Sequence, residues 1–355
     1  MKKNRNMKNS TGVWKRNVLI ALCSVLAVIL AVLVVGTVYI HSLLNNMDRF
    51  NPDDETMLNP SDAMLQTDPD LETIHPNSDE TLPHINGIEI DNDDIQTVYH
   101  GSHIKNILLV GQDRRPGQGR QRSDSMILLT VNTSKKTITM TSFMRDQYVE
   151  IPGYLPNKLN AAYAWGGFNL LNATLEKNFG IVVDGNVEVD FTSFKTLVDM
   201  LGGVEITLTQ GEVDWLRIYN GHDLKVGKNI LNGEQALNYS RIRKLDSDYK
   251  RSERQQKVLT SLFDSYKNKS VTELFSILEE VLRMVTTDMS NGEILRLAGD
   301  ILPMLSGMTT NNLRIPVDGT FKQGDVEVRE GLSNWFQYKI DFKANQKILE
   351  HLYEK

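Results

Sequence analysis

The sequence predicts an α/β fold: a single domain of α-β-α layers with a mixed central sheet, preceded by one transmembrane helix. Three observations predict it: strand and helix patterns alternate after residue 104, an apolar run extends from Val18 to Ile40, and an acidic segment lies between them. Short buried strands that alternate with amphipathic helices are typical of a sheet covered by helices. We therefore expect a basic cytoplasmic tail (1–16), a transmembrane helix (17–40), an acidic linker (41–103) and a folded domain (104–355).

The apolar run is long enough to cross a membrane, because roughly 20 apolar residues span the bilayer core as a helix. A cleaved signal peptide has an apolar core of only about 7–15 residues, and no clear small-x-small cleavage motif follows this run. Net charge is +6 over residues 1–40 and -13 over residues 41–100. The positive-inside rule then predicts a single-pass protein of the cell membrane, with its N-terminus in the cytosol and its domain outside.

Composition excludes several classes of function. Beyond residue 100 the net charge is only +1, which does not indicate a nucleic-acid-binding face. The seven histidines form no zinc-ligand spacing, and the single cysteine, Cys23, lies within the apolar run. The acidic linker has few periodic apolar residues, so we expect a mostly disordered spacer that holds the domain away from the membrane.

Strands and helices follow one another along the domain. Ile107–Val110 is a short apolar run typical of a buried strand, and Phe168–Phe179 has a helical pattern that stops before Gly180. The other expected strands are Met126–Val131, Ile138–Ser142, Asn186–Val189 and Val204–Leu208. The other expected helices are Phe191–Leu201, Gly233–Tyr239, Arg251–Tyr266, Val271–Val285 and Gly292–Leu305.

Two carboxylates lie at the ends of the loop GQDRRPGQGRQRSDS, which joins the first two strands. Asp113 follows one strand and Asp124 begins the next, so both are expected at one edge of the sheet. Paired carboxylates beside arginines suit a hard cation shared with phosphate oxygens. The alternative is two loop-capping aspartates paired with neighbouring arginines. A dinucleotide-binding loop is excluded, because Arg122 stands where its third glycine would be and a strand follows.

Arginines form two further groups. Arg145 follows the strand TMTSFM, and Arg241 and Arg243 would project to the same side of an extended segment. Arg251 and Gln255 share one face of the helix that also contains Arg254. Guanidinium groups bind phosphate through paired, permanent donors. The alternative is that these arginines only form a solvated surface.

Seven stretches, in order, resemble the LytR-CpsA-Psr (LCP) family of cell-wall phosphotransferases. They are NILLVGQDRR, RSDSMILLTVN, TMTSFMRDQYVEIPG, KLNAAYAWGG, VDFTSFKTLVDMLGGVEI, LNGEQALNYSRIRK and DYKRSERQQKVL. The resemblance covers about Ile104 to Leu259. The family usually combines an N-terminal transmembrane helix with an extracytoplasmic catalytic domain.

The resemblance implies a polyprenyl-pyrophosphate-linked glycan as donor, such as a teichoic acid or capsule precursor, and peptidoglycan as acceptor. It implies that Asp113 and Asp124 bind Mg²⁺, with Mn²⁺ as an alternative, and take part in catalysis together with Arg122 and Arg145. The implied pyrophosphate-binding set is Arg122, Arg145, Lys158, Arg241, Arg243, Arg251 and Gln255. One departure is Met144, where the family often has proline before the Arg-Asp pair.

Three functions are compatible with these residues. The first is transfer of a phosphoglycan, and the second is hydrolysis of the pyrophosphate, in which water replaces the sugar hydroxyl. The third is a non-catalytic role in lipid-carrier binding or regulation. Because the domain is expected outside the cell, DNA binding is not expected.

Overall fold

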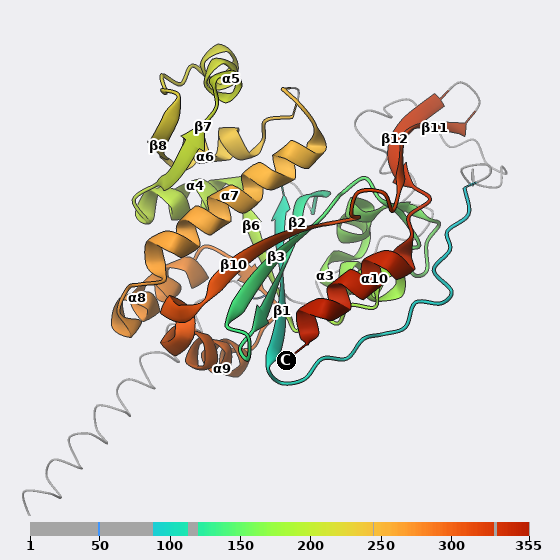
Figure 1. The fold of residues 1–355 in the computed structure, drawn as a ribbon, viewed down its shortest axis with the longest axis horizontal. Coiled ribbons are helices and arrows are strands. Elements are labelled where there is room, and N and C mark those ends of the chain that lie inside the picture. Colours follow the sequence, from blue (N-terminus) through green and yellow to red (C-terminus); the bar gives the residue numbers. More distant parts are fainter. Residues whose placement is uncertain (1–48, 50–87, 113–119, 244, 330–331, 355) are drawn as a thin grey trace, which may run out of the picture. The chain divides into compact units, whose positions relative to one another are not determined.

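The structure is a computed structural model that describes residues 49, 88–112, 120–243, 245–329 and 332–354. A mixed six-stranded sheet forms its centre. Its strand order is β10-β3-β2-β1-β6-β9 (Figure 1). The strands are β1 (Ile104–Gln112), β2 (Ser123–Asn132), β3 (Thr137–Phe143), β6 (Gly185–Asp190), β9 (Thr286–Thr287) and β10 (Thr309–Ile315). β1 and β2 are antiparallel, whereas β1 and β6 are parallel. The sequence prediction of a mixed central sheet is therefore confirmed.

Helices cover both faces of this sheet. On one face, α3 (Leu159–Phe179) and α10 (Phe342–Glu350) pack on β1 and β2 around buried side chains such as Leu108, Leu128 and Phe168. On the other face, α7 (Asp248–Tyr266) contacts β3 and β10. A smaller cluster there joins the sheet to α9 (Asn291–Ile301) and the 3₁₀ helix Leu302–Gly307. This burial of apolar faces on both sides is what holds the layers together.

Helix α3 is longer than the sequence pattern indicated. It begins at Leu159 rather than Phe168, and it contains a kink at Gly166 and Gly167, whose backbone angles are not helical. It ends at Gly180, which adopts a left-handed conformation with φ 70°. A Cβ atom at Gly180 would lie 2.3 Å from the carbonyl oxygen of Gln96, so glycine is required there on two grounds.

A second, smaller lobe is built on a two-stranded antiparallel sheet of β7 (Val204–Leu208) and β8 (Gly227–Leu231). The predicted strand Val204–Leu208 is thus present, but it does not join the central sheet. The helices of this lobe are α4 (Phe191–Met200), α5 (Gln210–Asn220) and α6 (Gly233–Ser240). They surround a separate apolar core that includes Val198, Leu216 and Tyr239, and α7 contributes Val258 to it.

The remaining elements lie mainly toward the C-terminus. They are β4 (Tyr148–Val149), β5 (Asn157–Lys158), α8 (Val271–Leu282), β11 (Lys322–Arg329), β12 (Leu332–Tyr338) and the 3₁₀ helix His351–Tyr353. β11 and β12 form a hairpin, which places β12 beside β4. This hairpin was not expected from the sequence, and it contributes Asn334 and Phe336 to the site described below.

The expected transmembrane helix, residues 17–40, lies outside the described residues, as does most of the acidic linker. Within the described ranges no helix combines the length and the apolar character needed to cross a bilayer. The last part of the linker, residues 88–103, differs from the disordered spacer that we expected. Ile90 and Ile95 pack on the domain core, and the Asn92 amide donates to Asn178 at 3.0 Å.

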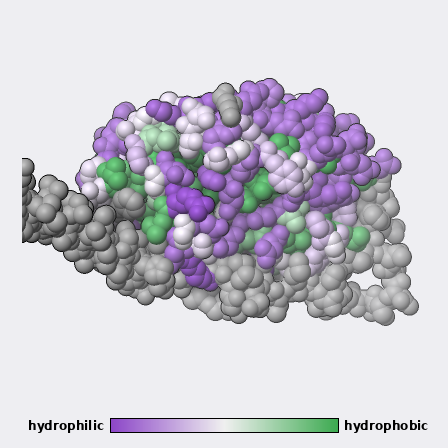
Figure 2. Space-filling model, turned by 90° about the horizontal axis from the view of Figure 1, so that it is seen from below, coloured by the Kyte–Doolittle hydropathy of each residue, from purple (hydrophilic) through white to green (hydrophobic). Residues whose placement is uncertain are grey.

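The surface seen from below in Figure 1 is mainly polar. Figure 2 shows that hydrophilic residues predominate on this face and that hydrophobic residues form small, separate groups. Apart from the area covered by grey atoms, this face has no continuous apolar surface.

Candidate active site

Charged side chains gather where β2 begins, where β3 ends and where α7 begins. Asp124 is the second residue of β2, and Arg145 and Asp146 follow β3 after Met144. Helix α7 starts at Asp248 because the Ser247 side chain accepts a hydrogen bond from the backbone N–H of Lys250. The antiparallel pairing of β2 with β3 brings the first two segments together, and contacts of α7 with β3 add the third.

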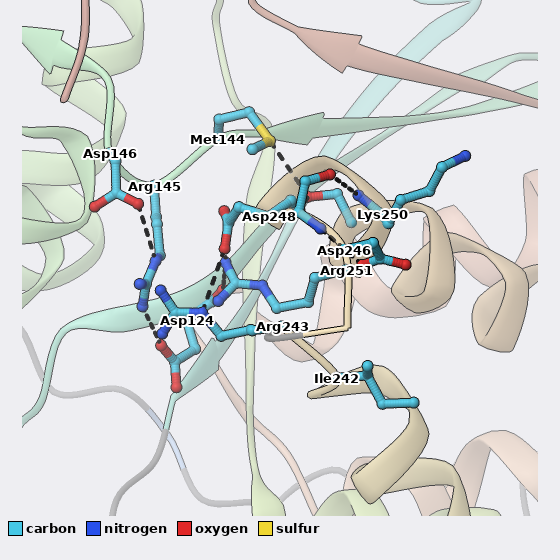
Figure 3. Close-up of polar contacts among 12 residues, drawn as sticks. Asp124, Met144, Arg145, Asp146, Ile242, Arg243, Asp246, Asp248, Lys250 and Arg251 are labelled. Carbon is cyan, nitrogen blue, oxygen red and sulfur yellow. Dashed lines mark hydrogen bonds and ion pairs between the residues drawn. The ribbon is translucent and has the colours of Figure 1, made fainter. Parts of the chain in front are cut away.

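Arg145 lies between two carboxylates (Figure 3). Its Nη1 donates to Asp124 Oδ1 at 3.0 Å, and its Nε donates to Asp146 Oδ2 at 3.3 Å. Burial works to lower the pKa of Arg145, but the charges of Asp146, Asp248 and Asp124 outweigh burial and raise it above its usual value. Arg145 is therefore a fixed, permanent cation.

Lys158 joins the same network through Asp146. Its Nζ lies 3.0 Å from Asp146 Oδ1 and donates to Asn334 Oδ1 at 3.0 Å. It also lies 5.3 Å from the ring centroid of Phe336, and its side chain is only 7% exposed. Asn334 and Phe336 belong to β12, so the C-terminal hairpin helps to position a cation that precedes α3.

Arg251 and Arg243 both approach Asp248, as Figure 3 shows. Arg251 Nη2 lies 3.0 Å from Asp248 Oδ2, and Arg243 Nε lies 3.5 Å from Asp248 Oδ1. Burial lowers the pKa of Arg251 to about 10, so this side chain is still charged at neutral pH. Its Nε is buried and has no hydrogen-bond partner in the described part of the chain. A buried donor of this kind favours an anionic ligand.

Arg241 is the predicted residue whose geometry differs most from expectation. Residues 241–243 were expected to be extended, but Arg241 ends α6 in a helical conformation. Its guanidinium lies 4.4 Å from the ring centroid of Phe191, in a cation–π contact. Ile242 is buried as expected. Arg243 pairs with Asp248, and Arg241 stacks on Phe191 at the start of α4.

The remaining predicted site residues are Asp113, Arg122 and Gln255. Asp113 lies outside the described residues, and Arg122 directly precedes β2. Gln255 is half-buried on α7, one turn beyond Arg251. Among the residues with described positions, no group of three or more His, Cys, Asp or Glu side chains could hold a metal ion.

Two functional candidates were not singled out from the sequence. Asp248 precedes Arg251 by three residues, and this i,i+3 spacing on one helix face was a signal for the pair. Asn334 gave no such signal, because its contact with Lys158 joins residues 176 positions apart.

The cluster therefore has the chemistry of an oxyanion site. Arg145, Lys158, Arg243 and Arg251 outnumber their carboxylate partners, and guanidinium groups from three segments converge on these carboxylates. Such a site can bind the charged oxygens of a pyrophosphate and stabilise charge that develops during phosphoryl transfer.

We expect Asp248→Asn to make the stability of the protein depend on a bound anion. The change leaves the buried Arg251 without its full countercharge, which should lower the free energy of unfolding by about 1–3 kcal/mol. Added pyrophosphate supplies that charge and should raise the melting temperature of the variant more than that of the wild type. Thermal unfolding with and without pyrophosphate measures this difference, and equal shifts in the two proteins would contradict the assignment.

A mixed α/β domain whose sheet edge carries a cluster of arginine and lysine side chains has a site suited to the oxygens of a phosphate group. The comparisons place it more narrowly: the model of the LytR_cpsA_psr family matches residues 55–350. The chain belongs to this family, as its sequence motifs indicated.

Proteins with similar sequences and structures support this family assignment. The polyisoprenyl-teichoic acid–peptidoglycan teichoic acid transferase TagU of Enterococcus faecalis is 39% identical over 196 residues, which cover 54% of this chain and 62% of the relative. The chain thus spans less than two thirds of that protein. The crystal structure of B. subtilis TagT is 27% identical, with a TM-score of 0.57 and coverage of 77% of this chain and 96% of TagT. A structure of YwtF (TagT) with bound octaprenyl pyrophosphate lipid is 26% identical, with a TM-score of 0.54 and coverage of 77% and 96%.

Proposed function

We propose that this protein transfers a phosphoglycan, of the teichoic acid or capsule type, from a polyprenyl-pyrophosphate carrier to peptidoglycan. The observation that carries the proposal is the buried Arg251, which is held by Asp248 and has an unpartnered Nε within the described residues. Arg251 lies in a network with Arg145, whose positive charge is stabilised by Asp146, Asp248 and Asp124. The names of the similar proteins, which include teichoic acid transferase and octaprenyl pyrophosphate lipid, support the substrate class.

The chemistry needs few reactive side chains. A sugar hydroxyl of the acceptor attacks the glycan-side phosphorus, the bond from this phosphorus to the bridging oxygen breaks, and polyprenyl phosphate leaves while the hydroxyl proton passes to solvent. Arg145, Arg243 and Arg251 bind the non-bridging oxygens and neutralise the charge of the transition state. Asp146 and Asp248 hold these cations in place, so little reorganisation is needed when the donor binds.

Mg²⁺, or Mn²⁺ in its place, would bind to Asp113 and Asp124. Asp124 fits this role, because its carboxylate is 35% exposed and the bond from Arg145 is made to Oδ1. The second oxygen of the carboxylate is a hard ligand that suits these cations. The bound cation would supply additional charge stabilisation for the phosphate oxygens.

We expect Asp124→Ala to uncouple pyrophosphate binding from the metal. In the wild type, added Mg²⁺ should tighten binding of pyrophosphate, since Asp124 would help to hold the cation and the cation would supply positive charge for the phosphate oxygens. In the variant, affinity measured by titration calorimetry should no longer depend on Mg²⁺. Asp214→Ala, at an exposed aspartate of α5, is the matched control. An unchanged Mg²⁺ dependence in Asp124→Ala would remove this residue from the metal site.

The apolar run at residues 17–40 supports a location for the reaction. We propose a single-pass protein of the cell membrane, with the N-terminus in the cytosol and the domain outside, where peptidoglycan lies. Protease added to intact cells should then digest the domain, and protection until the cells are lysed would contradict this topology.

Transfer can be separated from hydrolysis by supplying or omitting the acceptor. The full chain in detergent is incubated with a lipid-linked teichoic acid precursor and Mg²⁺, with and without peptidoglycan, and release of polyprenyl phosphate is measured. A transferase releases it mainly when the acceptor is present. Equal release of free phosphoglycan in both reactions would favour hydrolysis.

A further inference from the structure

A polar groove lies on the side of the first turn of α7 that faces away from the charge cluster. It has a volume of about 510 Å³, within the range of roughly 300–1,000 Å³ typical of ligand sites. One wall is α7, with Tyr249, Glu253 and Lys257, and the other is β10 with the segment that follows it, including Asn312 and Arg314. None of these residues belongs to the charge cluster described above.

The walls of this groove are rigid. Gln256 Nε2 donates to the carbonyl oxygen of Leu313 at 2.7 Å and to that of Met140 at 3.0 Å, which fixes α7 to β10 and β3. The Arg314 guanidinium lies 4.4 Å from the ring centroid of Tyr249 and 5.7 Å from that of Phe321. A site whose side chains are already fixed loses little entropy when a ligand binds.

The groove and the charge cluster share one thin wall. Ser252 lines the groove, and its Oγ contacts Met144 Sδ at 3.3 Å. Met144 directly precedes Arg145, and Ser252 directly follows Arg251. A molecule in the groove therefore lies beside the turn of α7 that holds the phosphate-binding arginines.

The charges of the groove indicate which substrate it suits. Those of Arg314 and Lys257 are cancelled by those of Asp318 and Glu253, so the lining is polar but neutral. A phosphate-rich polymer would gain no net attraction there, in contrast to the cation-rich cluster. The exposed amide of Asn312, the ring of Tyr249 and the buried Nε of Arg314, which has no hydrogen-bond partner among the described residues, instead suit the hydroxyl, amide and C–H groups of a sugar ring.

We propose that this groove binds the acceptor: a near-neutral strand of N-acetylated sugars that continues around the first turn of α7 to bring a hydroxyl to the phosphate bound by Arg145 and Arg251. The proposal rests on the proposed function, because it assigns the second substrate of the same reaction. It divides the two substrates by charge, with the pyrophosphate donor in the cationic cluster and the glycan acceptor in the neutral groove.

Binding of the two substrates can be measured separately. A soluble, lipid-free peptidoglycan glycan fragment and inorganic pyrophosphate are each titrated into the full chain in detergent. Tyr249→Ala and Asn312→Ala, on opposite walls, should each weaken binding of the fragment about tenfold, the effect of losing one central contact. Both should leave pyrophosphate affinity unchanged. Tyr219→Ala, at a 65% exposed tyrosine on α5, should bind both ligands like the wild type.

Other outcomes overturn the proposal. Wild-type affinity of both groove variants for the fragment, or no binding of the fragment to the wild type, would show that the groove is not the acceptor site. Weaker binding of an anionic glycerol-phosphate polymer in the groove variants, with unchanged binding of the fragment, would assign the groove to the donor instead. These titrations need no turnover, so a failure of the transfer reaction itself is recognised separately, by the absence of product in the wild type.

Discussion

Arg251→Lys is expected to weaken binding of the pyrophosphate donor by about 10- to 100-fold, the effect of losing a charge-assisted hydrogen bond of roughly 1.5–3 kcal/mol. Lysine keeps the charge, but it cannot reproduce the fork that reaches Asp248 through Nη2 and leaves Nε for the ligand. Donor affinity is measured by titration, together with thermal unfolding of the same samples. We expect the melting temperature to change little, because the ion pair with Asp248 can still form.

A matched substitution shows whether the loss is specific. Arg217→Lys lies on α5, where the arginine side chain is 55% exposed, and it should change neither affinity nor stability. If Arg251→Lys binds the donor as tightly as the wild type does, the guanidinium is not a phosphate ligand, and the cluster is a structural ion network.

Arg254→Ala should have the opposite profile, a large loss of stability. The Arg254 Nε donates to the buried Glu212 at 2.8 Å, its Nη1 donates to the carbonyl oxygen of Ile242 at 3.2 Å, and it also pairs with Asp246. Its side chain is 4% exposed. Removal of one partner of such a buried pair costs about 3–5 kcal/mol, because the remaining charge is left uncompensated.

Chemical denaturation of Arg254→Ala beside Arg217→Ala measures this cost. The exposed control should stay within about 0.5 kcal/mol of the wild type. If Arg254→Ala is as stable as the control, the contacts with Glu212 and Asp246 do not hold α5, α7 and the intervening loop together. Arg251 and Arg254 are three residues apart on α7, so the two predictions distinguish a role in binding from a role in stability.

The sequence pattern predicted the central strands and most helices, because their signals are local. Val204–Leu208 alternates between apolar and polar residues, which predicts a strand. The pattern does not say which partner the strand pairs with, and β7 pairs with β8 rather than with the central sheet. The hairpin of β11 and β12 was missed for a related reason, since its role depends on contacts with distant segments.

The candidate site shows the same difference between local signals and contacts with distant segments. The positions of Arg145, after a clear strand, and Arg251, on an amphipathic helix, were predictable from local patterns, whereas their assignment to the site came from the family resemblance. Arg241 does not lie in the extended segment that was considered for residues 241–243: α6 continues to Ser240, so Arg241 ends a helix and its side chain stacks on Phe191. Helix ends of this kind depend on tertiary contacts, here the packing of α6 on α4, which a single sequence does not contain.

The most direct test of the proposed reaction follows the two phosphorus atoms of the donor. A lipid-linked teichoic acid precursor with a radioactive label in the glycan-side phosphorus is incubated with the full chain, Mg²⁺ and peptidoglycan, and the washed peptidoglycan is counted. Attack of the acceptor hydroxyl on the labelled phosphorus should carry the label into peptidoglycan and release unlabelled polyprenyl phosphate. Label that remains with the lipid, or peptidoglycan that gains glycan without label, would contradict transfer of a phosphoglycan.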